Sequence, residues 1–169
     1  MTLQEYLNSI RKKTVAVVGI GVSNEPLIRM LLGEGIAVTA CDKRTREQLG
    51  ELAGELEHLG ARLQLGEDYL EGLDQNIIFR TPGLRPDVPQ LAKAVAQGSE
   101  LTSEMEVFFQ VCPCPIIAVT GSDGKTTTTT IIAELLKKAG YTVHVGGNIG
   151  HPLLCDAGSM RPDDYAVLE

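Results

Sequence analysis

Residues 121–127 combine backbone and side-chain groups that suit phosphate. The chain reads Gly-Ser-Asp-Gly-Lys-Thr-Thr there, directly after the apolar run 116–119. A short turn between a strand and a helix aims backbone N–H groups and the positive end of the helix dipole at one point. Lys125 adds a mobile cation, and Thr126 adds a hydroxyl that can hold magnesium. The residues expected to bind phosphate are Gly121, Ser122, Asp123, Gly124, Lys125, Thr126 and Thr127.

This loop departs from the standard phosphate-loop pattern at one position. The pattern G-x-x-x-x-G-K-[ST] requires glycine at position 119, where the chain has Val119. An alternative interpretation therefore stays open. In it, glycine only relaxes a strand-to-helix turn, and Lys125 is a solvated lysine of the first helical turn.

A second glycine turn lies near the start of the chain. Gly19 and Gly21 follow the apolar run 14–18 and match the first two glycines of G-x-G-x-x-G, whereas Asn24 replaces the third. Asp42 lies 21 residues beyond Gly21, near the position of the ribose-binding acid in dinucleotide-binding units. Two interpretations remain: an NAD-type site, or a Rossmann-like turn that uses glycine only for its shape.

The elements that must position these loops alternate between strand and helix patterns, which predicts an α/β fold with parallel sheets. The expected strands are 14–18, 36–41, 62–65, 76–79, 116–119, 141–145 and the beginning of one at 165–169. Helices are expected over 2–10 with a Thr2/Glu5 capping box, over Leu27–Leu32 up to Gly35, across Gly50 and Gly54, around Leu91, Ala94 and Val95 up to Gly98, and from 102 onward. A last helix should follow the phosphate loop and end at Gly140, with Ile131, Ile132, Leu135, Leu136 and Ala139 as its apolar face.

The run Cys112-Pro113-Cys114-Pro115 interrupts this alternation and predicts a domain boundary. We therefore expect a Rossmann-like, parallel-sheet domain over residues 1–112. The start of a P-loop ATPase α/β domain, truncated, should occupy residues 113–169.

Composition narrows the class of protein. A net charge of −7 argues against binding nucleic acid, and no apolar run approaches the roughly 20 residues of a membrane span. With no signal-peptide core at the start, the sequence predicts a soluble, cytoplasmic protein without membrane insertion. The four cysteines lack metal-ligand spacing and are expected to be reduced thiols, and the three histidines are scattered.

Three separated stretches resemble the Mur ligase family, the ATP-dependent amide-forming enzymes of cell-wall synthesis. They are the glycine turn of a Rossmann-like first domain, the V-T-G-S-D-G-K-T-T-T string at 119–128, and G-G-N-I-G at 146–150 followed by V-L-E at 167–169. The D-glutamate-adding members are the most similar, because later-acting members lack a Rossmann-like first domain. Members that add L-alanine share that domain but typically carry H-G-K-T in the loop.

The resemblance implies ATP and Mg²⁺ as cofactors, and UDP-N-acetylmuramoyl-L-alanine and D-glutamate as substrates. In this family ATP phosphorylates the substrate carboxylate, and the amine of the amino acid attacks the acyl phosphate. Lys125 would be catalytic by neutralising charge that develops on the γ-phosphate. Thr126 and Glu169 would hold magnesium. Asp123 stands where the family usually has Asn.

The resemblance also implies a nucleotide-sugar site in the first domain. Val22 and Ser23 would face the diphosphate, and Asn148 would reach it from the second domain. Uracil would lie between Asp42, Lys43 and Arg44 on one side and Thr81 to Gly83 on the other. At the position of Lys43 the family often has a small hydroxyl residue.

Compared with the family, the chain resembles an N-terminal portion, which we expect to be inactive alone, whereas the full-length enzyme is expected to be a monomer. Three other functions stay open. The first is a non-catalytic Rossmann module that binds NAD or another nucleotide, although such a module has no need of the second loop. The second is another amide ligase of the folylpolyglutamate or cyanophycin type. The third is a bare P-loop kinase, which Val119 and the preceding domain disfavour.

Overall fold

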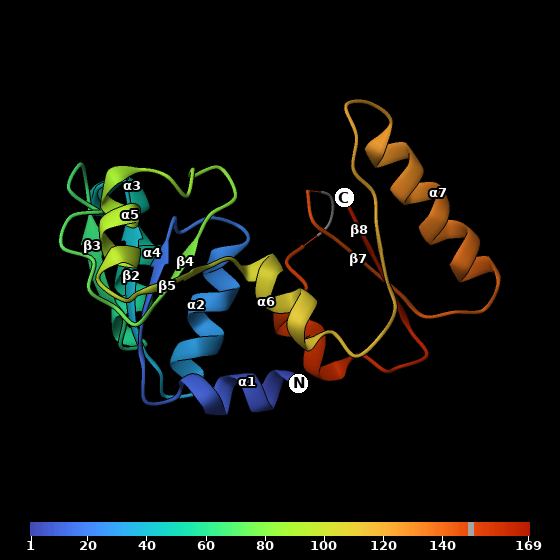
Figure 1. Ribbon diagram of the computed structural model, residues 1–169, viewed down its shortest axis with the longest axis horizontal. Helices are drawn as coiled ribbons and strands as arrows, with labels where there is room; N and C mark the ends of the chain where they lie inside the picture. The colour runs from blue at the N-terminus through green and yellow to red at the C-terminus, as the bar shows by residue number, and fades with distance from the viewer. Residues whose placement is uncertain (149–150) are drawn as a thin grey trace.

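The computed structural model describes residues 1–148 and 151–169, which form two parallel β-sheets side by side (Figure 1). The α/β class with parallel sheets is therefore confirmed. The first sheet ends at Thr102 and the second begins at Ile116. The predicted boundary between residues 112 and 113 lies in the segment that joins them.

The first sheet has five parallel strands in the order β3-β2-β1-β4-β5. Val15, Ala16, Val17 and Val18 of β1 are all buried, since a central parallel strand is covered on both faces. The strands are β1 (Thr14–Val18), β2 (Ala37–Asp42), β3 (Arg62–Leu65), β4 (Ile77–Arg80) and β5 (Glu100–Thr102).

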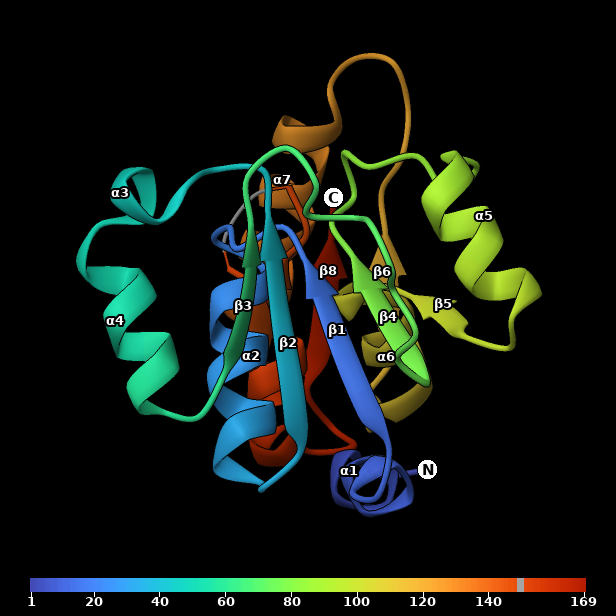
Figure 2. The ribbon, with the colours of Figure 1, turned by 90° about the vertical axis from the view of Figure 1, so that its left-hand side faces the viewer.

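Helices pack on both sides of this sheet, and of the described helices α5 (Pro89–Ala96) alone lies on the face turned to the viewer in Figure 2. Val15 and Val17 share a core with α1 (Leu3–Ile10), α2 (Asn24–Gly33), α4 (Glu51–His58) and α6 (Glu104–Val111). Ala16 and Val18 pack in a smaller cluster on the other side with α5. The alternating residues of one strand thus face two different cores.

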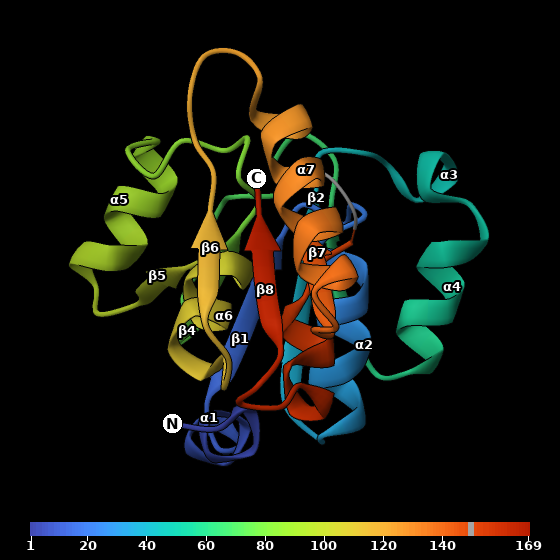
Figure 3. The same ribbon diagram turned by 90° about the vertical axis from the view of Figure 1, so that its right-hand side faces the viewer.

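The second sheet has three parallel strands in the order β6-β8-β7. The strands are β6 (Ile116–Ala118), β7 (Val143–Gly146) and β8 (Tyr165–Leu168). Figure 3 shows α7 (Lys125–Lys138) lying across the outer face of this sheet. A short 3₁₀ helix, η1 (Leu154–Ser159), precedes β8.

One hydrophobic core joins the two sheets. Ala166 and Leu168 of β8 and Leu154 of η1 belong to the same buried cluster as α1, α2 and α6, which lie between the sheets (Figure 1). The order of layers is therefore first sheet, helices, second sheet and α7.

Two local predictions are confirmed in atomic detail. Thr2 and Glu5 form the predicted reciprocal capping box at the start of α1. Gly35 follows α2 with φ +74°, the left-handed conformation that glycine adopts at helix ends.

Two predictions of element boundaries are wrong. A single helix does not run across Gly50, because φ +60° and ψ −133° there separate α3 (Arg46–Leu49) from α4. The helix predicted from residue 102 begins at Glu104 instead, capped by Ser103. Residues 100–102 pair with β4 as β5, a strand too short for sequence periodicity to reveal.

The predicted apolar face of α7 is only partly correct. Thr129 and Ala133 are the buried residues, and Ile132 and Leu136 are half-buried beside them. Ile131 and Leu135 are exposed, as is Ala139 just beyond the helix. Ile131 and Leu135 each lie two positions from the buried Ala133, and residues two apart lie on opposite sides of a helix. Only the side of α7 that carries Thr129 and Ala133 therefore meets β7 and β8.

Candidate functional site

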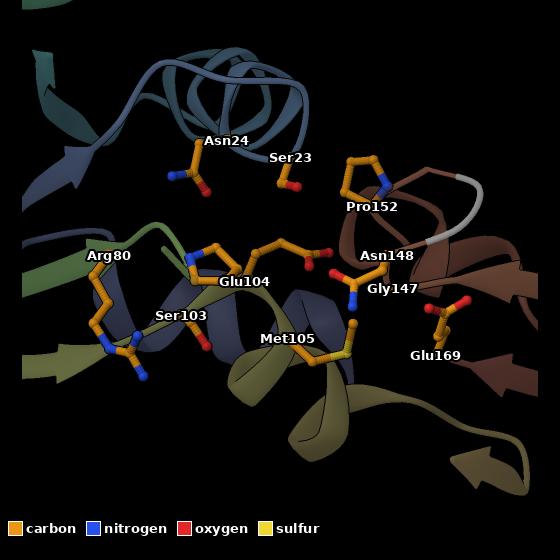
Figure 4. Close-up of a pocket in the computed structure, with 11 residues that line it drawn as sticks. Ser23, Asn24, Arg80, Ser103, Glu104, Met105, Gly147, Asn148, Pro152 and Glu169 are labelled. Atoms are coloured by element: carbon orange, nitrogen blue, oxygen red, sulfur yellow. The ribbon is translucent and has the colours of Figure 1, made fainter. Parts of the chain in front are cut away.

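A cleft of about 310 Å³ lies between the carboxyl ends of the two sheets (Figure 4). Ligands of open α/β sheets bind at this end, where neighbouring strands continue in opposite directions. In the first sheet that point lies between β1, whose chain continues into α2, and β4, whose chain continues toward α5. The cleft is lined by Ser23, Asn24, Arg80, Pro82, Ser103, Glu104, Met105, Gly147, Asn148, Pro152 and Glu169.

The glycine turn after β1 is packed closely against the turn after β4. Gly19 has φ +90°, and its N–H donates to the Cys41 carbonyl at 2.7 Å. A Cβ at Gly19 would lie 3.0 Å from the Cβ of Thr81. Both the conformation and the close approach therefore require glycine there.

Asn24 replaces the third glycine of the sequence pattern and is only 2% exposed. Its Nδ2 donates to the carbonyls of Val18 at 3.2 Å and Gly19 at 2.9 Å, which fastens the start of α2 to the end of β1. Among the described residues, its buried Oδ1 has no hydrogen-bond partner. Sequence reasoning treated Asn24 only as a departure from a glycine pattern and did not place it in the site.

Glu104 is a second cleft residue that sequence reasoning missed. It is 6% exposed, and its Oε1 accepts the backbone N–H of Leu154 at 2.7 Å. Burial raises the pKa of this carboxyl, and hydrogen bonds from the backbone of Leu154 and Leu153 only partly oppose that rise. In the sequence, Glu104 fell only within a helix expected from residue 102, and such a local pattern carries no information about its partner Leu154, 50 positions later.

Arg80, also missed, brings a positive charge to the cleft (Figure 4). It ends β4, and its Nη1 donates to the Leu84 carbonyl at 3.2 Å. Ser23, at the start of α2, faces the same space.

Asp42 braces the glycine turn. Its carboxylate accepts the N–H of Ile20 at 2.7 Å and the N–H of Arg44 at 2.9 Å, and it pairs with the Arg44 guanidinium at 2.9 Å. Arg44 also donates to the Ile20 carbonyl. Burial raises the pKa of Asp42, but the hydrogen bonds from Arg44 and Ile20 outweigh it, so the net pKa is lowered.

Of the residues predicted around uracil, only Pro82, within the range Thr81 to Gly83, lines the cleft. Asp42 is buried and bonded as described, whereas Lys43 and Gly83 face solvent. Val22, predicted to face the diphosphate, is strongly exposed and also lies outside the cleft lining. Thr81 is half-buried against Gly19. The cleft brings together Ser23, Asn148 and Glu169 of the predicted site residues, with Pro82 from the predicted range Thr81 to Gly83.

The phosphate-loop residues form an exposed turn between β6 and α7. Gly124 has φ +72° and caps the 14-residue α7, whose first residue is Lys125. The Lys125 ammonium donates to the Gly121 carbonyl at 2.8 Å, so it folds back over the loop. The chain thus places a cation, a glycine turn and a helix N-terminus together, as predicted.

Thr126 and Glu169 are 43 residues apart in sequence and meet at the end of the second sheet. The Thr126 Oγ1 donates to Glu169 Oε2 at 2.7 Å. Two adjacent oxygen ligands of this kind suit Mg²⁺, which is usually bound by one or two protein oxygens together with phosphate and water. Because Glu169 also lines the cleft, it connects the loop with the cleft.

The Gly146-Gly147-Asn148 turn is built around the backbone of Glu169. The N–H of Glu169 donates to the Gly146 carbonyl at 3.1 Å, and the N–H of Asn148 donates to the Glu169 carbonyl at 3.2 Å. A Cβ at Gly147 would lie 2.3 Å from that carbonyl oxygen. The last two residues of the G-G-N-I-G stretch, Ile149 and Gly150, lie outside the described residues.

Within residues 1–148 and 151–169, no group of three or more His, Cys, Asp or Glu side chains is arranged to hold a metal. The four cysteines are free thiols, as predicted, and the sulfurs of Cys112 and Cys114 are 3.5 Å apart. Over the same residues, no helix has both the length and the apolar character that crossing a membrane requires.

Comparison with known proteins agrees with this geometry. Residues 119–169, which contain the phosphate loop and Glu169, match the Mur ligase middle domain. Over 168 residues the chain is 51% identical to the UDP-N-acetylmuramoylalanine–D-glutamate ligase of Ruminiclostridium cellulolyticum. The matched region is 99% of this chain and 36% of that protein. The chain belongs to the Mur ligase family. A Clostridium botulinum protein of the same name is 52% identical over 166 residues, covering 98% of this Mur ligase chain and 36% of the relative.

The chain also superposes on parts of solved structures. A pseudomurein peptide ligase type C from Methanothermus fervidus superposes with a TM-score of 0.50 at 25% identity, covering 92% of this chain and 32% of that one. The UDP-N-acetylmuramate–alanine ligase from Thermotoga maritima has a TM-score of 0.49 at 21% identity, covering 93% and 36%. This Mur ligase chain spans about a third of the length of the curated relatives it matches.

Proposed function

We propose that this Mur ligase chain carries the nucleotide-sugar cleft and the ATP phosphate loop of a ligase that adds D-glutamate to UDP-N-acetylmuramoyl-L-alanine. The reaction would proceed through an acyl phosphate formed with ATP, in a step of peptidoglycan precursor synthesis in the cytoplasm. The relatives' names supply the substrate class, and the arrangement of the cleft and the loop supports it.

The observation that carries the proposal is the position of Glu169. It lines the cleft and receives the Thr126 hydroxyl from the phosphate loop at 2.7 Å. A substrate carboxylate at this end of the cleft would therefore lie beside the site of the transferred phosphate. That proximity is what a phosphoryl transfer to a carboxylate needs.

Each group in the loop would have a separate part. The ammonium of Lys125 would leave the Gly121 carbonyl and stabilise negative charge on the outer phosphates. Thr126 and Glu169 would hold Mg²⁺, which would offset phosphate charge when bound. Backbone N–H groups at the start of α7 would donate hydrogen bonds to the phosphate oxygens.

The nucleotide-sugar would enter from the first sheet. Ser23 and Arg80 offer a hydroxyl and a positive charge for the diphosphate, and Asn148 offers an amide from the other side of the cleft. Outside the cleft lining, at or just after the carboxyl ends of β2 and β4, lie the residues beside which a uridine could extend: Asp42, Lys43, Arg44, Thr81 and Gly83. Asp42 is already bonded to Arg44 and Ile20, so its part would be to hold that edge in shape.

The first test is a calorimetric titration with UDP-N-acetylmuramoyl-L-alanine, with NAD as the comparison ligand. We expect the uridine ligand to bind and NAD not to bind. In Asn148→Ala the affinity should fall by about five- to tenfold, the effect of one lost hydrogen bond. Binding of NAD alone would refute the proposal and favour a Rossmann cofactor module.

The second test addresses the loop by titration with Mg-ATP. We expect Lys125→Ala to lower the affinity by about tenfold or more, because a charge-assisted hydrogen bond is lost. Lys138→Ala, at the opposite end of the same helix, is the matched control and should bind as the wild type does. Equal affinities of all three proteins would contradict the role given to Lys125.

A further inference from the structure

The amide oxygen of Asn24 is a buried hydrogen-bond acceptor at the wall of the cleft. Asn24 is 2% exposed, and among the described residues its Oδ1 has no partner. Leaving such an acceptor unpaired costs about 1–3 kcal/mol of stability, so native structures seldom keep one without use.

The orientation of this amide follows from its bonds. Nδ2 donates both of its protons, one to the Val18 carbonyl at 3.2 Å and one to the Gly19 carbonyl at 2.9 Å. Turning the amide over would place Oδ1 against two carbonyl oxygens, which repel it. Figure 4 shows the nitrogen turned toward the end of β1 and the oxygen turned to the side of the cleft. The oxygen itself has less than 1 Å² of exposed surface, so a ligand must displace the groups that cover it to reach it. The group offered to a ligand is therefore an acceptor.

Glu104 strengthens this character of the inner wall. Its carboxyl is 6% exposed and lies in the same cleft, with Oε1 bonded to the Leu154 N–H. Donors lie elsewhere on the cleft wall, at Arg80 and Ser23. The cleft thus has one part that suits anionic oxygens and another that suits N–H or O–H groups.

A diphosphate cannot satisfy Asn24, because its ionised oxygens are acceptors only. Sugar hydroxyls and acyl-amide N–H groups are donors and can. We propose that Asn24 is a specificity-determining residue of this cleft, whose Oδ1 accepts a hydrogen bond from a hydroxyl or amide N–H on the sugar part of the nucleotide-sugar. The proposal rests on the proposed function and adds how the sugar is distinguished from the nucleotide alone.

The test compares two ligands, UDP-N-acetylmuramoyl-L-alanine and UDP, by calorimetric titration. Their affinity ratio is the readout, because a loosened turn after β1 would affect both ligands alike. In Asn24→Ala the affinity for the sugar ligand should fall by about five- to tenfold, and that for UDP by less than about twofold. Asn8→Ala removes an exposed asparagine on α1 and should leave both affinities unchanged.

A second variant separates the oxygen from the nitrogen. Asn24→Asp keeps an acceptor in the cleft only if its carboxyl is protonated, because an ionised oxygen would be repelled by the Val18 and Gly19 carbonyls. Burial favours the protonated form, whose O–H can donate to one of these two carbonyls in place of the two amide N–H groups. Asn24→Asp should retain the preference for the sugar ligand over UDP, with thermal unfolding measured to confirm that each variant is folded. An equal loss for both ligands in Asn24→Ala, no loss for either, or a lost preference in Asn24→Asp would overturn the role of Oδ1. If the wild type binds neither ligand, the proposed function fails and this inference fails with it.

Discussion

At the scale of single residues, the buried carboxylate of Asp42 organises the nucleotide-sugar end of the chain. It receives hydrogen bonds from the backbone of Ile20 and from both the backbone and the side chain of Arg44. Those bonds connect the turn after β1 with the segment after β2. The acid that the sequence placed near a ligand is therefore engaged within the protein.

Replacing Asp42 with Asn should destabilise the fold by about 1–3 kcal/mol at pH 7, because charge-assisted hydrogen bonds in a buried site are lost. The pKa of Asp42 is lower in the folded protein than its ordinary value of 3.8. Its stabilising effect is thus fully present above pH 3.8 and disappears as the pH falls through the folded pKa. Urea unfolding from pH 7 to pH 3 should show a smaller loss of stability in Asp42→Asn than in the wild type. Parallel pH profiles would contradict this prediction.

At the scale of elements, glycines decide where helices stop. Gly50 adopts φ +60° and ψ −133°, which only glycine adopts readily, and so divides α3 from α4. Gly54 lies within α4, is exposed, and a Cβ added there would meet no atom within 4 Å. The backbone conformation at Gly50 therefore requires glycine, whereas Gly54, four residues later, has room for a side chain.

Gly50→Ala should lower the free energy of unfolding by about 1–3 kcal/mol, because alanine is strained in that conformation. Gly54→Ala should raise it by about 0.5–1 kcal/mol, because alanine is the better helix former. Urea unfolding of the two variants beside the wild type measures both effects. Changes of the same sign in the two variants would show that Gly50 does not act through its backbone conformation.

At the scale of the whole molecule, the two sheets are joined by one buried cluster of side chains. Leu154 of η1 is 1% exposed and packs among residues from both sheets, and its N–H bonds to Glu104 of α6. Because the cluster is continuous, we expect both sheets to unfold in one cooperative transition.

Leu154→Ala should destabilise the whole chain by about 2–5 kcal/mol through the cavity it leaves. Leu135→Ala, on the exposed side of α7, should change stability by less than about 0.5 kcal/mol. Far-ultraviolet circular dichroism reports both sheets. In a Tyr6→Phe, Tyr69→Phe background the near-ultraviolet tyrosine signal reports only the packed pair Tyr141 and Tyr165, the latter in β8 of the second sheet. The two probes should give coincident transitions, whereas separate midpoints would show that the sheets unfold independently.

The sequence by itself determined the features that depend on neighbouring residues. Apolar runs predicted the central strands, Thr2 and Glu5 predicted a capping box, and the loop before Lys125 predicted a glycine turn at a helix start. These features were predictable because turn geometry, strand burial and helix capping are set within a few residues. The family resemblance was carried by the same short stretches.

Only the tertiary structure decided which side chains meet. The contact of Thr126 with Glu169 was expected from family resemblance. The contact of Glu104 with Leu154 was not, since it joins α6 to η1, 50 positions apart in the sequence. In the sequence, Asn24 was only a residue in place of the third glycine of G-x-G-x-x-G. In the structure, its hydrogen bonds to Val18 and Gly19 turn its oxygen to the side of the cleft. Burial, partner and direction depend on how distant elements pack, and a local pattern carries no information about that packing.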